Sequence, residues 1–287
     1  MPLDDQRAYL ARLGVEAEPP SADALVRLHR AQVERVPYET LWIHTGDRWG
    51  IGLDESVARI AKSTRGGYCF HLNGAFSVLL QSLGYQVRRH VGGVHGPVRV
   101  PDQEMANHLV LTVEGLPTDR CPDGVWYVDA GLGDALHEPV PLAAGPIEQG
   151  PFSMRLDELS DDDVGDWHLT HDPAGGFVGM AWHATPSTID AFAAKHEWLS
   201  TAPESGFVRV LTVQRRDATG VDILRGCVLQ RVGAGASSAD LGSKAELGDA
   251  LTDLFGLDLT SVDPTRIDAM WERMAREHER WVAAGRP

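Results

Sequence analysis

The spacing of apolar residues changes near Gly84, and this change constrains the fold more than any other feature. Before it, apolar residues recur at helical spacing, as on the stripe of Leu72, Phe76, Leu79 and Leu83. After it, short β-rich runs with an alternating pattern follow one another, separated by Gly, Pro and Asp turns. The pattern predicts helices first and antiparallel sheet second.

Three sections follow from this reading. Residues 1–84 are predicted to be helical, and residues 85–186 to form antiparallel sheet, with a barrel as one possible form. Residues 187–287 mix helices and strands. The runs expected as strands are 86–91, 107–113, 125–129, 177–182, 207–214 and 223–232, and the late helices are 189–199, 244–255 and 264–283.

Charge and cysteine content exclude several classes of protein. The 26 basic and 41 acidic residues give a net charge of -15, which argues against nucleic acid or an anionic membrane as the main partner. A small anionic ligand remains compatible with a local basic pocket. Three cysteines without CxxC spacing exclude a disulfide framework and a zinc ribbon. We find no signal peptide, membrane span or metal motif, and we expect a cytoplasmic protein without a metal.

The segment RGGYCFHLN at residues 65–73 carries the strongest chemical signal. Its glycines allow a tight turn, and Cys69 then falls in the first turn of a predicted helix. There the helix dipole and free amides favour a thiolate and can stabilise an oxyanion, while Arg65 adds positive charge. Cys69 is therefore a candidate nucleophile. A buried structural cysteine at a helix start is the open alternative.

A thiolate nucleophile needs an imidazole, which in turn needs an orienting carboxylate. If two neighbouring predicted strands form a hairpin that pairs Val113 with Gly124, His108 lies directly opposite Asp129 on the same face. A slip of one residue would place the two on opposite faces. An ordinary turn residue at a strand end is the alternative for Asp129.

Several segments in sequence order together resemble the arylamine N-acetyltransferase family, and the similarity covers the chain from about residue 1 to about residue 275. They are VPYETL at 36–41, RGGYC at 65–69, NHLVL at 107–111, YVDAGLG at 127–133 and STAPESGFV at 200–208. The resemblance implies an α+β fold with a catalytic core like that of cysteine proteases and transglutaminases. In it, residues 1–84 are a helical bundle with the catalytic cysteine, 85–186 a central antiparallel β-barrel with the histidine and aspartate, and 187–287 an α/β lid with C-terminal helices.

The resemblance also implies a reaction and a site. Acetyl-CoA would acylate Cys69, with His108 as base and Asp129 as orienting carboxylate, and an arylamine, hydrazine or N-hydroxyarylamine would then take the acetyl group. Acetyl-CoA is the implied co-substrate, and a homodimer is left open. The positions that would line the acceptor pocket are Tyr38, Val94, Leu132 and Phe207, and those placed near CoA are Gly131 and Thr201.

The chain departs from the family pattern close to these residues. His71 stands where Glu or Gln is usual, Tyr38 and Thr40 replace Phe and Asn, and Leu132 replaces Phe. His71 is either a second imidazole near the thiol or a helix residue with a local hydrogen bond. The changes at Tyr38 and Leu132 alter the polarity and size of the pocket, so they leave the acceptor open.

Other functions use the same residues. An amide synthase of natural-product assembly would keep the triad and change the acyl group. A thiol hydrolase would keep the triad and use water. A binding protein for small aromatic or CoA-like ligands would contain a cysteine of ordinary reactivity.

Overall fold

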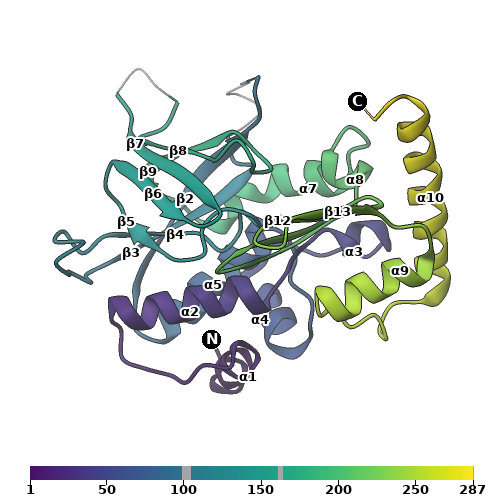
Figure 1. Cartoon of the computed structure of the whole chain (residues 1–287). Coiled ribbons are helices and arrows are strands. Elements are labelled where there is room, and N and C mark those ends of the chain that lie inside the picture. The colour runs from purple at the N-terminus through teal and green to yellow at the C-terminus, as the bar shows by residue number, and fades with distance from the viewer. Residues whose placement is uncertain (99–104, 161–163, 287) are drawn as a thin grey trace.

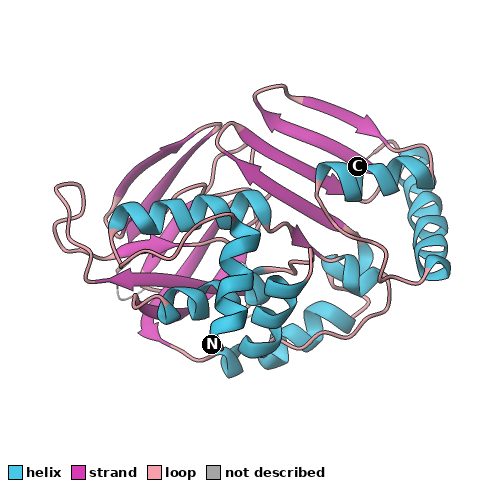
Figure 2. Cartoon of the chain, turned by 90° about the horizontal axis from the view of Figure 1, so that it is seen from below, coloured by secondary structure: helices cyan, strands magenta, loops and turns pink. Residues whose placement is uncertain are grey.

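The computed structural model describes residues 1–98, 105–160 and 164–286. A layer of N-terminal helices lies beneath a large curled sheet, and a smaller sheet with the C-terminal helices lies beside them (Figure 1). Figure 2, seen from below, shows the helices lying across the large sheet, with the small sheet set to one side. The predicted α+β fold class is confirmed.

The predicted N-terminal helices are confirmed, and their ends follow local signals. Ser21 accepts a hydrogen bond from the Ala24 amide at 3.1 Å and so caps the second helix, which stops before Pro37. The last of these helices begins at Cys69 and is buried along most of its length. The helices are α1 (Leu3–Leu13), α2 (Ala22–Arg35), α3 (Leu41–His44), α4 (Leu53–Lys62) and α5 (Cys69–Ser82).

The large sheet has eight antiparallel strands in the order β5-β4-β3-β2-β9-β8-β7-β6, and it curls into a nearly closed barrel (Figure 1). One face of β2, β3 and β4 packs on α5, and the other faces a separate apolar cluster inside the barrel. The strands are β2 (Gln86–His95), β3 (His108–Glu114), β4 (Trp126–Val128), β5 (Val140–Pro141), β6 (Gly145–Gln149), β7 (Phe152–Glu158), β8 (Trp167–Thr170) and β9 (Gly179–Pro186).

The smaller sheet combines one strand from the N-terminal section of the chain with four strands from its C-terminal section. Its order is β1-β10-β11-β12-β13, and Tyr38 on β1 pairs with Gln214 on β10. Residues that precede the RGGYC segment therefore share a sheet with the C-terminal section. The strands are β1 (Tyr38–Glu39), β10 (Thr212–Asp217), β11 (Gly220–Arg225), β12 (Val228–Gly233) and β13 (Ser237–Asp240).

The sequence-based predictions for two strands in the C-terminal section were wrong. The run 207–214 is a strand only from Thr212, because Ser205 accepts from the Phe207 amide at 3.2 Å and starts a short helix, α8 (Gly206–Arg209). The run 223–232 is two strands, because Gly226 adopts a φ of 58° and reverses the chain between β11 and β12.

The predicted late helices are confirmed, with changes of helix type along two of them. Asp263 caps the last helix, and Pro264 is its first residue. The helices α9 and α10 pack on the smaller sheet around an apolar cluster that contains Met270 and Met274. These elements are the 3₁₀ helix η1 (Ile189–Phe192), α7 (Ala193–Thr201), α9 (Lys244–Asp249), the π-helix η2 (Ala250–Leu254) and α10 (Pro264–Ala283).

Candidate active site

Cys69 is the first residue of α5 and is 3% exposed. The glycine pair before it lies against the chain next to β1. A Cβ at Gly66 would sit 1.9 Å from the Pro37 carbonyl oxygen, and Gly67 has a φ of 111° while its carbonyl accepts from the Glu39 amide at 2.9 Å. Only glycine fits both positions, and the packing fixes where the helix begins.

The Cys69 thiol reaches the backbone just before β3. Its Sγ donates to the Asn107 carbonyl at 3.5 Å. The Asn107 side chain in turn bonds the backbone of Val94 on β2, at 2.8 Å from the Val94 amide and 2.9 Å to its carbonyl. Asn107 therefore links Cys69 to two barrel strands, and it was not among the predicted site residues.

His108 and Asp129 meet beside this thiol. His108 Nε2 lies 2.8 Å from Asp129 Oδ2, and the two side chains are 2% and 0% exposed. Burial lowers the pKa of His108, but the Asp129 carboxylate and the Cys69 sulfur outweigh it and raise that pKa to about 10. The imidazole is thus stabilised as its cation.

The predicted register that placed His108 opposite Asp129 was wrong by two residues. Val113 pairs with Trp126 rather than Gly124, because Gly124 has a φ of 66° and folds back so that the Leu116 amide donates to its carbonyl. A shift of two preserves the face of every side chain. The two residues therefore still share a face, and they meet past the end of the β3–β4 ladder.

Asp129 is held by three further donors. Asn73 Nδ2 donates to its Oδ1 at 2.7 Å, the Gly131 amide to the same oxygen at 3.0 Å, and the Tyr127 hydroxyl to Oδ2 at 3.1 Å. Asn73 also bonds the Leu109 carbonyl, which lies on β3. The carboxylate is held rigidly in one orientation. The roles of Asn73 and Tyr127 were missed, although Asn73 stands in the segment 65–73 and Tyr127 in the segment 127–133, which carried part of the resemblance.

Gly131 also lies against the helix that begins at Cys69. A Cβ there would lie 2.9 Å from the Cys69 Cα and 2.9 Å from the Asn73 side-chain nitrogen. The residue that follows, Leu132, is buried with the apolar cluster inside the barrel, and Val94 packs against the same cluster. These three predicted residues thus lie on the barrel side of the site.

Tyr38 and Phe207 lie together on the side of the smaller sheet. Their ring centroids are 6.3 Å apart, and the Phe207 ring lies 5.2 Å from that of Tyr68, the residue before Cys69. Burial, and then the nearby Cys69 sulfur, raise the pKa of the Tyr38 hydroxyl well above its usual range. Thr201 is not brought to this group. It is exposed at the end of α7, and its hydroxyl donates to the Glu197 carbonyl of its own helix at 2.7 Å.

Arg65 does not act as a free positive charge beside the thiol. Its guanidinium makes a two-point ion pair with Glu39, at 2.9 and 3.1 Å, and both side chains are buried. The pair fixes the glycine turn against β1. The role of Arg65 in the described structure is thus to hold the glycine turn in place, rather than to add positive charge beside the thiol.

His71 serves its own helix. Its Nδ1 accepts from the Tyr68 amide at 3.3 Å and so gives this amide a partner at the start of α5. The ring is fully buried among Trp42, Trp49 and Tyr68, and burial lowers its pKa well below the usual value. Of the two predictions for this residue, the local hydrogen bond is confirmed.

Neither a membrane span nor a metal centre is found in the described part of the chain. None of its helices combines the length and apolar character needed to cross a bilayer. Across residues 1–98, 105–160 and 164–286, no group of three or more His, Cys, Asp or Glu side chains is placed to hold a metal ion.

Comparison with known proteins places the chain in a family. A sequence profile described as N-acetyltransferase matches residues 21–263. The arylamine N-acetyltransferase of Mycolicibacterium smegmatis is 30% identical over 266 residues, which cover 89% of this chain and 92% of that protein. The chain belongs to the arylamine N-acetyltransferase family. Arylamine N-acetyltransferase 1 of Homo sapiens is 27% identical over 249 residues, which cover 78% and 82% of the two chains.

Solved structures of arylamine N-acetyltransferases share the fold. The M. smegmatis enzyme aligns with a TM-score of 0.79 at 28% identity, covering 94% of this chain and 97% of that chain. The Nocardia farcinica enzyme aligns with a TM-score of 0.80 at 26% identity, covering 93% of each. The Mycobacterium marinum enzyme, solved in complex with CoA, aligns with a TM-score of 0.81 at 24% identity and supports the fold. Family membership assigns this chain to the acetyltransferases.

Proposed function

We propose that this protein transfers an acetyl group from acetyl-CoA to an arylamine, arylhydrazine or N-hydroxyarylamine by a ping-pong mechanism through an acyl thioester on Cys69. The observation that carries the proposal is the buried His108–Asp129 pair, joined at 2.8 Å, beside a cysteine at a helix N-terminus. Thiolate, imidazolium and carboxylate in this order are the parts that acyl transfer requires. The solved CoA complex of the M. marinum relative supports a CoA thioester as donor.

In the first half-reaction the Cys69 thiolate attacks the thioester carbonyl carbon. Free amides in the first turn of α5 would stabilise the tetrahedral oxyanion. Collapse of that intermediate breaks the bond to the CoA sulfur, and the His108 imidazolium gives its proton to the departing thiolate. CoA leaves as the thiol, and the acetyl group stays on Cys69.

In the second half-reaction the amine attacks the acetyl carbonyl of Cys69. An arylamine is weakly basic, so it is largely unprotonated at neutral pH and can attack directly. His108, now neutral, accepts the proton that the nitrogen loses, and the Cys69 thiolate departs. This restores the thiolate–imidazolium pair and releases the amide.

The acceptor site is proposed to lie between the two groups of predicted residues. Tyr38 and Phe207 would form one wall and Val94 and Leu132 the other, with Cys69 between them. Gly131 and Thr201 remain proposals for contacts with CoA, as does the division of the chain at residues 84 and 186. All three cysteines are free thiols, so we place the activity in a reducing cytoplasm.

Initial velocities with acetyl-CoA and an anilide-forming amine such as p-anisidine test the mechanism. Parallel double-reciprocal lines, with CoA released in proportion to N-acetylanisidine, are expected. Intersecting lines would contradict the acyl-enzyme. CoA release that exceeds amide formation at saturating amine would favour a thiol hydrolase, and acylation without transfer to any arylamine would favour an amide synthase.

A further inference from the structure

Tyr68, the residue before Cys69, lies where α5 meets the C-terminal section of the chain. It is 0% exposed, and its carbonyl accepts the first hydrogen bonds of α5, from the amides of His71 at 2.9 Å and Leu72 at 3.1 Å. The two residues before it are glycines and have no side chain to pack. The Tyr68 ring is therefore the first side chain before Cys69 that can hold the start of the helix in place.

His196 on α7 holds the hydroxyl of this ring. Its Nδ1 lies 2.5 Å from the Tyr68 hydroxyl oxygen, and its Nε2 lies 2.8 Å from the Trp49 carbonyl oxygen, so both ring nitrogens have a partner. A carbonyl oxygen only accepts, so the hydrogen of the neutral imidazole is on Nε2, and Nδ1 accepts from Tyr68. Burial lowers the pKa of His196 below its usual value, which keeps the ring neutral at pH 7.

The Tyr68 hydroxyl is a matching donor. Burial, and then the nearby Cys69 sulfur, raise its pKa above the usual value, so the hydroxyl keeps its proton. Within residues 1–98, 105–160 and 164–286, His196 is the only hydrogen-bond partner of this hydroxyl. The orientation of the phenol therefore depends on one nitrogen atom of His196.

Trp49, at the other end of this link, is held by its own contacts. It lies between α3 and α4, and its ring stacks on that of Trp42 with the centroids 5.2 Å apart. The Cζ atoms of Arg59 and Arg65 lie 4.0 and 4.8 Å from the centre of the Trp49 ring. These contacts hold the residue that accepts from His196, so the imidazole has a firm support on the side away from Tyr68.

We propose that His196 is a positioning residue for Cys69: its Nδ1 holds the Tyr68 hydroxyl, and through Tyr68 it fixes the start of α5, so that the thiol meets His108. The inference rests on the proposed function and deepens it, because it adds a residue of the C-terminal section to those on which acylation of Cys69 depends. His196 does not touch the reacting atoms and acts through Tyr68.

Two amide variants separate the two nitrogens of His196. His196→Asn places an oxygen near the position of Nδ1 and keeps an acceptor for Tyr68, whereas His196→Gln places a nitrogen near the position of Nε2 and keeps only the donor to Trp49. His196→Ala removes both. The rate constant for acetylation of Cys69 in a single turnover is measured for each variant, together with the free energy of unfolding in urea.

His196→Asn should acetylate Cys69 at close to the wild-type rate. His196→Gln and His196→Ala should slow this step by roughly tenfold to a hundredfold, because the nucleophile is displaced. A merely structural role would make the loss of rate follow the loss of stability instead. Equal rates for the Asn and Gln variants, or a faster Gln variant, would overturn the assignment.

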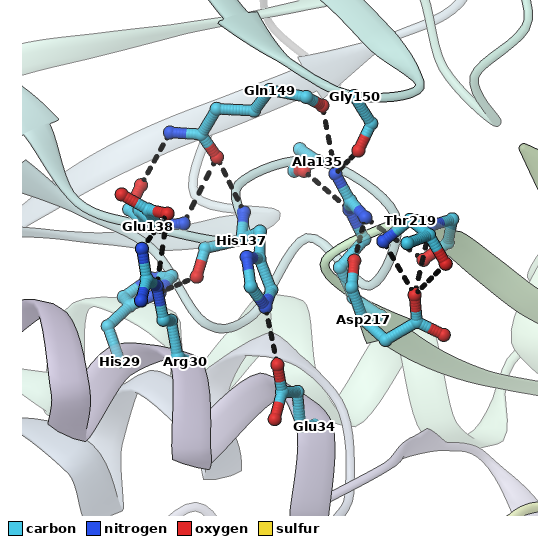
Figure 3. Close-up of polar contacts among 12 residues, drawn as sticks. His29, Arg30, Glu34, Ala135, His137, Glu138, Gln149, Gly150, Asp217 and Thr219 are labelled. Atoms are coloured by element: carbon cyan, nitrogen blue, oxygen red, sulfur yellow. Dashed lines mark hydrogen bonds and ion pairs between the residues drawn. The ribbon is translucent and has the colours of Figure 1, made fainter.

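His137→Ala is the matched control. His137 is also a buried histidine that links two elements, because its Nε2 lies 2.7 Å from Glu34 Oε1 on α2 (Figure 3). Its removal should lower the free energy of unfolding without slowing the acetylation of Cys69. A loss of rate as large as that of His196→Ala would show that the effect is not specific to the contact with Tyr68, and the proposal would fail.

A double-mutant cycle tests whether His196 acts through Tyr68. Tyr68→Phe keeps the ring and removes the hydroxyl, so it should slow acetylation about as much as His196→Gln does. Adding His196→Gln to Tyr68→Phe should then cause little further loss, because the hydrogen bond is already absent. Two losses that multiply in the double variant would contradict the proposed route.

Alkylation of Cys69 by iodoacetamide separates this inference from the proposed function, because it needs no acyl donor. A displaced thiol loses its pairing with His108 and reacts more slowly. If the wild type takes no acetyl group from acetyl-CoA, the proposed function fails alone, and alkylation that slows in His196→Gln but not in His196→Asn still supports the positioning role. Alkylation at one rate in both variants would overturn that role.

Discussion

The side-chain amide of Asn73 donates to the Asp129 carboxylate at 2.7 Å, and Asn73 lies one helical turn beyond Cys69 on α5. The helix that carries the proposed nucleophile therefore also holds the carboxylate that orients the proposed base. The Asn73 oxygen accepts from the Ala130 amide at 2.9 Å, which fixes the chain on the far side of Asp129 as well. Helix and barrel are thus joined at the point where Cys69, His108 and Asp129 meet.

Asn73→Ala should lower both activity and stability. The substitution leaves the Ala130 amide and the Leu109 carbonyl without a partner in the core, at a cost of about 1–3 kcal/mol. Acetylation of Cys69 should slow by roughly a hundredfold, because Asp129 loses its fixed orientation. Urea denaturation and single-turnover acetylation measure the two effects. Gln81→Ala, at an exposed position of the same helix, should change neither; if it does, the effect is not specific to the carboxylate.

Asp129→Asn should change the pH dependence of acetylation. In the wild type the Asp129 carboxylate helps to raise the pKa of His108 to about 10, so the imidazolium that protonates CoA persists until the pH rises through that value. Removing the carboxylate charge lowers this pKa. The alkaline limb of the acetylation rate should therefore move to lower pH, and the maximal rate should fall by roughly 10³-fold. An alkaline limb at the same pH in both proteins would contradict the assigned coupling.

Glu39→Gln should destabilise the fold strongly. It leaves the buried Arg65 guanidinium without its counter-charge, and breaking a buried pair in this way costs about 3–5 kcal/mol. The free energy of unfolding from guanidinium denaturation measures the loss. Glu277→Gln, which breaks the exposed pair with Arg280, serves as the control and should cost less than about 1 kcal/mol. Equal effects would show that the Arg65 pair is solvated.

Gly131→Ala should act mainly on activity. The added Cβ would meet the Cys69 Cα at 2.9 Å, so either the helix start or the Asp129 loop must shift. Such a shift would change the position of Cys69 relative to His108, and we expect it to reduce acetylation by roughly a hundredfold. Gly248→Ala offers a matched control, because a Cβ there meets nothing within 4 Å. In the helix α9 that change should leave the rate unaltered and raise the free energy of unfolding by about 0.5–1 kcal/mol.

Much of the site could be predicted because its signals are local. The glycine pair and the helical stripe after it placed Cys69 at a helix start, and strand alternation placed His108 and Asp129 on one face. When the register of two paired strands shifts, a side chain changes to the other face of the sheet only if the shift is by an odd number of residues. The prediction that His108 and Asp129 share a face therefore remained correct, although the Gly124 turn displaced the strand pairing by two residues.

What could not be predicted depends on contacts between distant segments. The role of Asn73 needs the barrel to bring Asp129 against α5, and the charge of Arg65 is compensated by Glu39, 26 residues earlier. Phe207 was expected in a strand, but Ser205 caps a short helix there, and only the fold shows that the Phe207 ring packs against Tyr68, the residue before Cys69. Apolar spacing contains no information on any of these pairings.

Intact-protein mass spectrometry after brief incubation with acetyl-CoA tests the central claim most directly. The wild type should gain a single acetyl group, mapped by peptide digestion to Cys69. Cys69→Ser should gain none, and p-anisidine should discharge the adduct within the time of one turnover with formation of an equal amount of N-acetylanisidine. An acetyl group on another residue, or amide formation by folded Cys69→Ser at the wild-type rate, would contradict the account.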